Sequence, residues 1–354
     1  METAAFDYEL PPERIAQHPI EPRDAARLLV DRGPGAPAVH ACVRDLPTLL
    51  EPGDLLVVND TRVLPARLAL RKATGGAVEV FLLEPVEGAE DARWQALVRP
   101  SRKVAPGTTL TPVRDVASGT AVEVLDDLGE GRRVVRLRCP GGTGREAQLA
   151  AIAEMGQMPL PPYITAPLEE QDRYQTVYAD APGSAAAPTA GLHFTDALLD
   201  AVRVRGVAIA TVELIVGLDT FRPIIVDTVE DHQMHTEAYR VPAATWDLVE
   251  ATHARGGRVV AVGTTALRAL ESAAARGELA GRTDLFVHDP YEFAVVDRLL
   301  TNFHLPRSSL LVLIDAFVGP HWRDLYREAL EGDYRFLSFG DAMLLTRRRE
   351  QVAA

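Results

Sequence analysis

The stretch GSAAAPTAGLHFT, residues Gly183–Thr195, carries very little side-chain bulk before its last three positions. Its alanines, glycines and proline would make a poor hydrophobic core and a poor amphipathic helix, but they suit a loop whose backbone closely approaches another group. Thr195 then predicts the cap of a helix over Asp196–Arg205, which Gly206 ends. We therefore expect His193 on a loop that leads into a helix N-terminus, where anionic ligands are favoured. The alternative is a loop histidine that caps its own backbone.

Strands and helices alternate around this loop, and this alternation predicts an α/β domain. Apolar runs of strand length follow turn residues, and apolar residues at helical spacing follow most of these runs. The predicted strands are Arg27–Asp31, Gly53–Asn59, Val207–Val216, Arg258–Gly263, Leu285–His288 and Leu310–Ala316, and the predicted helices besides Asp196–Arg205 are Thr245–Arg255, Ala266–Arg276 and His321–Glu331.

Residues 65–150 have a different pattern, in which short alternating segments are separated by turns rich in glycine. Regularly spaced short strands without helical periodicity are typical of a small β-barrel. We therefore predict a larger mixed α/β catalytic domain over residues 1–64 and 151–354, with an inserted β-barrel domain over residues 65–150. The predicted barrel strands are Ala77–Leu83, Arg93–Arg99, Thr120–Leu125 and Arg133–Arg138.

The composition is that of a folded protein, with 47% hydrophobic and 25% charged residues in 354. The N-terminus lacks a basic region followed by an apolar run, and no stretch approaches the roughly 18 apolar residues of a spanning helix. The two cysteines, Cys42 and Cys139, give neither a metal-ligand spacing nor a disulfide framework. The sequence thus predicts a cytoplasmic protein that does not enter the membrane.

The net charge of −13 argues against nucleic-acid binding, but the charge is unevenly distributed. Residues 65–150 carry 13 basic and 11 acidic side chains, and the basic ones lie in clusters. Such clusters could form a local surface that faces phosphates, or they could be the solvated face of a sheet balanced by nearby acids. Among the basic residues of this segment are Arg67, Arg102 and Lys103.

Two junctions place polar residues directly after predicted strands. Asp60 and Arg62 follow the strand Gly53–Asn59, at the end where ligand groups gather in α/β sheets, although a salt bridge at a strand end would look the same. Thr264 and Thr265 stand between a predicted strand and a predicted helix, where hydroxyl and free N–H groups can hold a carboxylate or a phosphate. Capping explains this junction equally well.

Two further segments carry histidines. Asp231, His232 and His235 could suggest a metal site, but there is no HExxH motif, no cysteine partner and no clear third ligand, so acid–base work or plain hydrogen bonding is favoured. Asn302 and His304 lie on a polar loop between apolar runs, a natural position for a functional site. The sequence contains no Walker loop, GxGxxG fingerprint or nucleophile elbow.

Several motifs together resemble those of one family. They cover nearly the whole chain, and the combination of PTAGLHF, NDTRVLPARL and TNFHLP is highly specific. The chain is similar to the S-adenosylmethionine:tRNA ribosyltransferase-isomerase family of queuosine biosynthesis. The motifs are GDLLVVNDTRVLPARL (53–68), MPLPPYI (158–164), DRYQTVYA (172–179), AAPTAGLHF (186–194), VGTTALRALES (262–272), VVDRLLTNFHLP (295–306) and YRFLSFGDAML (334–344).

The resemblance implies a monomeric enzyme, both transferase and isomerase, with an inserted β-barrel. It implies that the ribosyl part of S-adenosylmethionine is transferred to the aminomethyl group of a 7-deazaguanine at the tRNA wobble position and rearranged, with release of adenine and methionine. The product is epoxyqueuosine in tRNA. S-adenosylmethionine is a co-substrate, and no cofactor or metal is implied.

This chemistry needs a base for the carbon beside the sulfonium, an acid for the departing adenine and cations for the tRNA phosphates. We expect acid–base roles for His193 and Asp60. Thr189, Thr264, Thr265 and Arg268 are expected to hold the methionine carboxylate or the ribose, and Asn302 and His304 to line the same cleft. Further candidates for substrate binding are Arg62, Glu213, Asp231, His232 and His235, and those for tRNA contacts are Arg67, Arg102 and Lys103.

The chain departs from the family pattern at two places. Where the family usually shows H-x-G-x-G-T-F, this chain has Ile215 and Asp219 at the histidine and the second glycine. A usual Y-P-G is replaced by His288-Asp289-Pro290. These changes leave open a divergent relative that uses S-adenosylmethionine with another, small-molecule acceptor. A non-catalytic tRNA-binding relative is the third reading, and the retained NDTR, PTAGLHF and TNFHLP motifs argue against it.

Overall fold

The computed structural model describes residues 1–86, 88, 92–117, 119–216 and 223–348. The chain divides into two compact units. The larger unit comprises Met1–Thr61, Pro161–Ala181 and Ala187–Ala354, and the smaller comprises Arg62–Leu160 and Pro182–Ala186.

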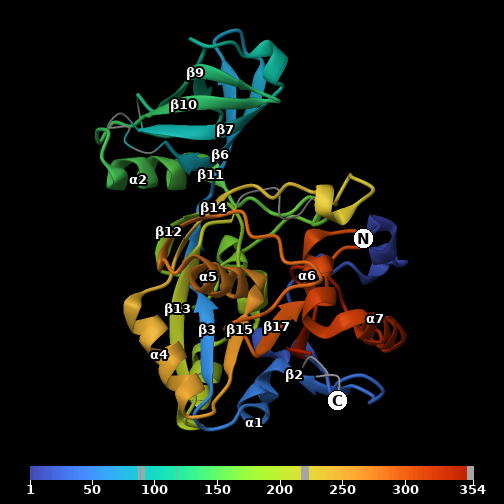
Figure 1. The fold of residues 1–354 in the computed structure, drawn as a ribbon. Coiled ribbons are helices and arrows are strands. Elements are labelled where there is room, and N and C mark those ends of the chain that lie inside the picture. The colour runs from blue at the N-terminus through green and yellow to red at the C-terminus, as the bar shows by residue number, and fades with distance from the viewer. Residues whose placement is uncertain (87, 89–91, 118, 217–222, 349–354) are drawn as a thin grey trace. The chain divides into compact units, whose positions relative to one another are not determined.

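A mixed sheet runs through the larger unit (Figure 1). Within the described residues it has nine strands, and its four central neighbours β13, β3, β15 and β17 run parallel, whereas β18 pairs antiparallel with β17. The carboxyl ends of these four strands therefore meet at one edge of the sheet. In spatial order the strands are β16 (Ala280–Thr283), β14 (Glu237–Arg240), β13 (Ala208–Leu214), β3 (Leu55–Asn59), β15 (Val259–Val262), β17 (Arg298–Asn302), β18 (Ala342–Thr346), β1 (Arg27–Val30) and β2 (Val39–Cys42).

The central strands are buried on both faces, as their continuous apolar sequence requires. On one face, Leu56 and Val58 of β3 pack in a core cluster with Leu198 and Val202 of α3. On the other face, α4 and α5 contact the same strands, and Figure 1 shows both helices in front of the sheet. The helices are α1 (Leu46–Leu49), α3 (Asp196–Val204), α4 (Ala243–Ala254), α5 (Gly263–Arg276), α6 (Ser309–Val318) and α7 (Trp322–Glu331), with α2 (Arg145–Met155) in the smaller unit.

The helix after the alanine-rich stretch is confirmed, together with its cap. The Oγ1 atom of Thr195 accepts a hydrogen bond from the N–H of Leu198 at 3.1 Å. The stretch itself contributes strand β12 (Ala181–Ser184), which pairs with β4 (Thr61–Val63), and the short 3₁₀ helix η7 (Thr189–His193).

Two predicted strands are wrong. Leu310–Ala316 lies in α6, because a short apolar run is equally consistent with a buried strand and a buried helix. Ser308 decides between them, since its Oγ atom caps the helix by accepting from the N–H of Leu311. Leu285–His288 pairs with no neighbouring strand in the described structure, because side chains take its backbone groups: Leu285 N–H bonds Thr283 and Leu285 C=O bonds Arg268.

The smaller unit contains the predicted β-barrel, and its strands pair antiparallel. Six of its described strands close on themselves through the pairing of β5 with β8, and β11 adds to β5. Sequence patterning did not mark β5, β8 or β11, which are short or lie beside turns. In spatial order the strands are β11 (Gly156–Gln157), β5 (Arg67–Lys72), β6 (Ala77–Pro85), β7 (Arg93–Arg99), β10 (Arg132–Arg138), β9 (Ala121–Gly129) and β8 (Thr109–Pro112).

Within the described residues, no helix combines the length and the apolar character that crossing a bilayer requires.

Candidate active site

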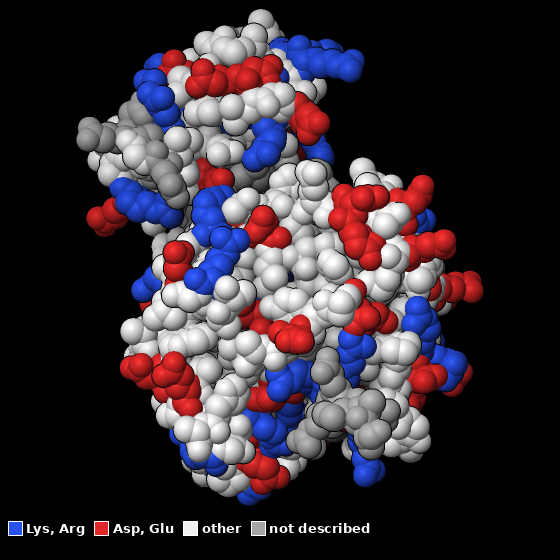
Figure 2. Space-filling view, in the orientation of Figure 1, with Lys and Arg blue, Asp and Glu red and all other residues white. Residues whose placement is uncertain are grey.

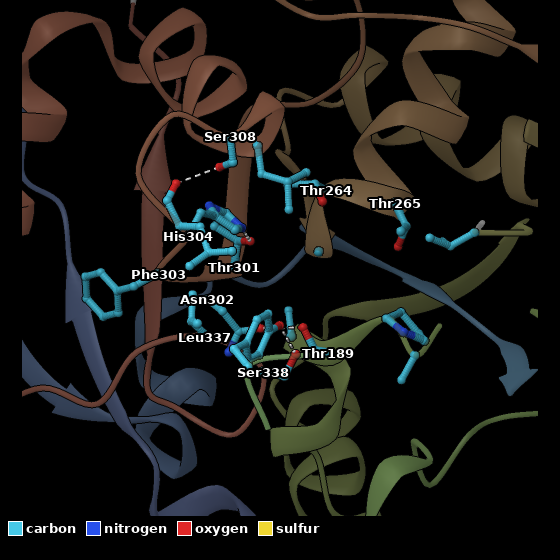
Figure 3. Close-up of a pocket in the computed structure, with 18 residues that line it drawn as sticks. Thr189, Thr264, Thr265, Thr301, Asn302, Phe303, His304, Ser308, Leu337 and Ser338 are labelled. Atoms are coloured by element: carbon cyan, nitrogen blue, oxygen red, sulfur yellow. Dashed lines mark hydrogen bonds between the residues drawn. The ribbon is translucent and has the colours of Figure 1, made fainter. Parts of the chain in front are cut away.

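A pocket in the larger unit opens at the carboxyl ends of β15 and β17 (Figure 3). Its empty space is about 650 Å³ including its open mouth. Figure 3 shows Thr264 and His304 on one side of the pocket and Thr189 and Ser338 on the other. The predicted substrate-binding residues that line it are Thr189, Thr264, Thr265, Asn302 and His304.

Asn302 is the centre of a hydrogen-bond network at the pocket wall. Its Oδ1 atom accepts from the Thr189 hydroxyl at 2.9 Å, and its Nδ2 atom donates to Nε2 of His193 at 3.1 Å and to the carbonyl of Asp341 at 3.3 Å. The Asn302 side chain, which is 3% exposed, is thus fixed at both ends of its amide. A carboxamide held in this way presents a constant orientation toward the pocket.

His193 lies behind Asn302 and does not line this pocket. It borders a separate small cavity together with Arg23 and Ser338. Burial, together with the positive charges of Arg335 and Arg23, lowers the pKa of His193 to about 3. The ring is therefore neutral at physiological pH and accepts the Asn302 amide proton at Nε2.

His304 does line the pocket. Its Nε2 atom lies 3.3 Å from the Thr301 hydroxyl, and its backbone is held by Tyr8 and Tyr326. Its buried Nδ1 atom has no hydrogen-bond partner among the described residues. Burial lowers the pKa of His304 to about 3, so this ring is also neutral and has one nitrogen available to a ligand.

Asp60 follows β3 at the same edge of the sheet but does not line the pocket. Burial and the charges of Glu213 and Asp180 raise its pKa, while a hydrogen bond from Thr211 opposes the rise. Its Oδ1 atom is buried without a partner among the described residues. Burial raises the pKa of Tyr178, and the charge of Asp60 raises it further. The two side chains therefore lie close enough to interact electrostatically.

A second, smaller pocket adjoins the first at the start of α5. Val216, Thr264, Thr265 and Leu310 line both. Arg268, one helical turn into α5, lines the smaller pocket with the aromatic ring of Phe286 and several aliphatic side chains. Its partner is Glu237, and the two form a buried ion pair.

The other predicted substrate-binding residues lie elsewhere. Glu213 pairs with the exposed Arg240, and Asp231 ends the short 3₁₀ helix η9 (Val229–Asp231). The ring of His232 packs edge-on against Phe286. Burial lowers the pKa of His232, and the charge of His235 lowers it further. Five of the predicted substrate-binding residues therefore line neither of the two pockets: Arg62, Glu213, Asp231, His232 and His235. In the described part of the chain, no three His, Cys, Asp or Glu side chains are grouped to hold a metal ion.

The two departures from the family pattern can be placed only in part. Ile215 donates its N–H to the carbonyl of Ala238 at 2.9 Å, so it continues the edge of β13. Asp219 lies outside the described residues. His288 packs against Phe286, and Asp289 pairs with Arg348, so this replacement is accommodated by contacts within the larger unit.

The candidate tRNA-contacting residues lie in the smaller unit. Arg67 pairs with Glu79 at 3.4 Å, whereas Arg102 and Lys103 are exposed on the short 3₁₀ helix η5 (Ser101–Lys103). Figure 2 shows Lys and Arg side chains interspersed with Asp and Glu on the visible face of the protein. The visible surface is therefore mixed in charge.

Sequence reasoning missed four polar residues that line the main pocket. The hydroxyls of Tyr163 and Ser338 bond each other at 2.7 Å across 175 residues of sequence. Both lie in motifs that carry the family resemblance, MPLPPYI and YRFLSFGDAML, and that position was the available signal. The four residues are Tyr163, Thr301, Ser308 and Ser338.

Comparison with known proteins identifies the family. Residues 3–345 match the family model described as queuosine biosynthesis protein. The S-adenosylmethionine:tRNA ribosyltransferase-isomerases of Anaeromyxobacter sp. (strain Fw109-5) and Heliobacterium modesticaldum are 52% and 50% identical, each over 98% of this chain and 99% and 100% of the relative. The crystal structure of S-adenosylmethionine tRNA ribosyltransferase from Thermotoga maritima has a TM-score of 0.54 and 38% identity, covering 96% of this chain and 99% of that one. The chain belongs to the S-adenosylmethionine:tRNA ribosyltransferase-isomerase family.

Proposed function

We propose that this protein transfers the ribosyl group of S-adenosylmethionine to the aminomethyl-7-deazaguanine wobble base of tRNA and isomerises it, forming epoxyqueuosine-tRNA. Adenine and methionine are the other products. The observation that carries this function is that three separate family motifs, PTAGLHF, VGTTALR and TNFHLP, supply the walls of one pocket. Relatives of this name match the chain over nearly its full length.

The site residues are assigned roles from their positions. His304 is the imidazole that touches the substrate, because it lines the pocket and its Nδ1 atom has no partner among the described residues. His193 acts through Asn302, whose amide it orients. An acid–base role for His193 itself, which the sequence predicts, requires a direct path from its ring to the substrate.

The acid that protonates departing adenine must be a group that holds a proton near neutral pH. Both buried imidazoles fail this condition, since their pKa values are lowered to about 3. Asp60 meets it better, because burial and neighbouring carboxylates raise its pKa. We therefore keep Asp60 as the acid; because it does not line the main pocket, this role requires the adenine end of the substrate to extend from that pocket to the unpartnered Oδ1 atom.

The barrel residues Arg102 and Lys103 are proposed to contact tRNA phosphates, since both are exposed and lie together on one turn. Arg67 is a third contact in this proposal, although it also pairs with Glu79. The family resemblance further supports a cytoplasmic monomer, whose mass in solution is measurable by light scattering.

The decisive experiment measures adenine release from S-adenosylmethionine. The purified protein is given tRNA that bears the aminomethyl-deazaguanine, unmodified tRNA as the control, or the free base. We expect release only with the modified tRNA. Release with the free base alone would instead identify a small-molecule acceptor, and tRNA binding without any release would identify a non-catalytic relative.

A further inference from the structure

The helix α5 begins without a side-chain cap at the boundary of the two adjoining pockets. Its N-cap residue is Val262, which can offer no side-chain hydrogen bond, and Thr264 and Thr265 of its first turn line both pockets. The first N–H groups of a helix have no partner within the helix, and they attract anions together with the helix dipole. With 14 residues, α5 is long enough for its N-terminus to attract an anion in this way.

Two unpartnered donors beside this helix end point independently to a ligand. Arg268 is only 4% exposed, and it uses Nε for the carbonyl of Leu285 and Nη1 for Glu237, whereas its buried Nη2 has no partner among the described residues. The buried hydroxyl of Thr265 also has no partner there. Both side chains line the smaller pocket. A buried donor left without an acceptor costs about 1–3 kcal/mol, so both groups favour an acceptor from outside the chain.

The charge at this position suits a monoanion. The buried carboxylate of Glu237 already pairs with the Arg268 guanidinium, so the ion pair leaves little net positive charge for a ligand. A dianionic phosphate would face Glu237 with insufficient compensation, whereas a carboxylate needs only the remaining N–H groups and the Thr265 hydroxyl.

Apart from Ser309, the rest of the smaller pocket is apolar, and it is continuous with the main pocket through the residues they share. A ligand that spans both pockets would place a carboxylate at the start of α5, an aliphatic part against the apolar lining and its larger group in the main pocket. The apolar lining of the smaller pocket comprises Val216, Met234, Leu285, Phe286, Val287, Leu310 and Leu313.

We propose that the start of α5, Thr265 Oγ1 and Arg268 Nη2 form a subsite for the α-carboxylate of the methionine part of S-adenosylmethionine. This proposal rests on the proposed function and chooses the carboxylate over the ribose as the group held by this turn. The main pocket, with Asn302 and His304, then receives the ribosyl and adenine parts. Methionine leaves from the smaller pocket after the sulfonium bond to the ribosyl carbon breaks.

The test compares the affinity of the full chain for S-adenosylmethionine and for decarboxylated S-adenosylmethionine by calorimetry. We expect the wild type to prefer the carboxylated ligand by about ten- to a hundredfold, as charge-assisted hydrogen bonds at a buried site imply. Thr265→Val should lower this preference about threefold to tenfold, and Arg268→Met should bring it close to one. Arg276→Met, the same change in the last turn of α5 where the arginine pairs with the exposed Asp284, is the matched control and should keep the wild-type preference.

Each outcome decides something. Equal affinities of the wild type for the two ligands would overturn the carboxylate subsite, while adenine release with modified tRNA would leave the proposed function standing. Wild-type protein that binds neither ligand and releases no adenine would overturn both. If Arg268→Met leaves Glu237 unpaired and fails to fold, Thr265→Val decides the matter, because its hydroxyl has no partner among the described residues.

Discussion

The position of His193 behind Asn302 leads to a prediction about how this histidine acts. Replacing it with glutamine keeps a side chain of similar length and a carbonyl oxygen that can accept the Asn302 amide proton, but removes the imidazole. The substitution can weaken one hydrogen bond, the 3.1 Å bond from Asn302 Nδ2 to residue 193. Asn302 keeps its hydrogen bonds to Thr189 and Asp341. A hydrogen bond contributes about 1 kcal/mol, so we expect His193→Gln to lower kcat for adenine release by no more than about fivefold.

Alanine at the same position should be more damaging. His193 is 4% exposed, and removing a buried ring leaves a cavity that typically costs about 2–4 kcal/mol of unfolding free energy. The Asn302 amide also gains freedom to rotate, so we expect His193→Ala to lower kcat by about ten- to a hundredfold. Adenine release is measured by chromatography at saturating substrate, beside urea unfolding of each variant. The exposed His18 provides the control His18→Gln, which should match the wild type in both assays.

A double-mutant cycle then separates positioning from proton transfer. If His193 acts through Asn302, the double variant His193→Gln/Asn302→Ala should have the same kcat for adenine release as Asn302→Ala alone. The side chain that His193 orients is already absent from the single variant. The reasoning would be refuted if folded His193→Gln were as inactive as His193→Ala, with both losing more than about a thousandfold. That result would support the acid–base role that the sequence predicts.

Three further predictions concern stability and tRNA binding. Burial lowers the pKa values of His304 and His193 to about 3 from their ordinary 6.5, so between these values the unfolded chain binds protons that the folded protein excludes. The free energy of unfolding should therefore fall as pH drops below about 6.5, with up to about 1.4 kcal/mol per pH unit from each histidine. His304→Gln should remove its own share of this slope in urea unfolding, whereas an unchanged slope would contradict the assignment. A Cβ at Gly191 would lie 1.9 Å from the Tyr178 hydroxyl, so Gly191→Ala should cost about 1–3 kcal/mol in thermal unfolding, unlike Gly144→Ala, which meets nothing within 4 Å; equal midpoints would show that η7 can shift. Replacing Arg102 and Lys103 with glutamine should raise KM for tRNA at constant kcat and reduce the slope of log kcat/KM against log salt by about one per lost phosphate contact, and an unaltered slope would exclude both as contacts.

Much of the fold could be predicted because strand-length apolar runs and turn residues mark it locally. The strand at Arg93–Arg99 has the predicted bounds, and the Thr195 cap begins its helix where expected. The run over Leu310–Ala316 is one of two exceptions, since a helix that is apolar nearly all round gives no periodic signal. The capping residue Ser308, and not the apolar run, indicates that a helix begins here.

The pocket residues were predictable where they follow a strand directly. Thr264, Thr265 and Asn302 lie at the ends of β15 and β17, and parallel strands bring such ends together. The place of His193 behind Asn302 was not predictable, because it depends on which face of η7 packs against a residue 109 positions away. The hydroxyl pair of Tyr163 and Ser338 depends in the same way on tertiary packing between distant segments.

Four buried polar atoms without partners among the described residues follow strands at this edge of the sheet. Asp60 Oδ1 follows β3, the Thr265 hydroxyl and Arg268 Nη2 follow β15, and His304 Nδ1 follows β17. Each is buried without an acceptor or donor among the described residues, at a cost of about 1–3 kcal/mol to the free protein. A bound substrate that supplies acceptors and donors to these four atoms would remove this cost. In the proposed function, the Arg268 guanidinium and the Thr265 hydroxyl bind a carboxylate, and the carboxyl of Asp60, whose pKa is raised, supplies the proton. These are the groups that the cleavage of S-adenosylmethionine requires.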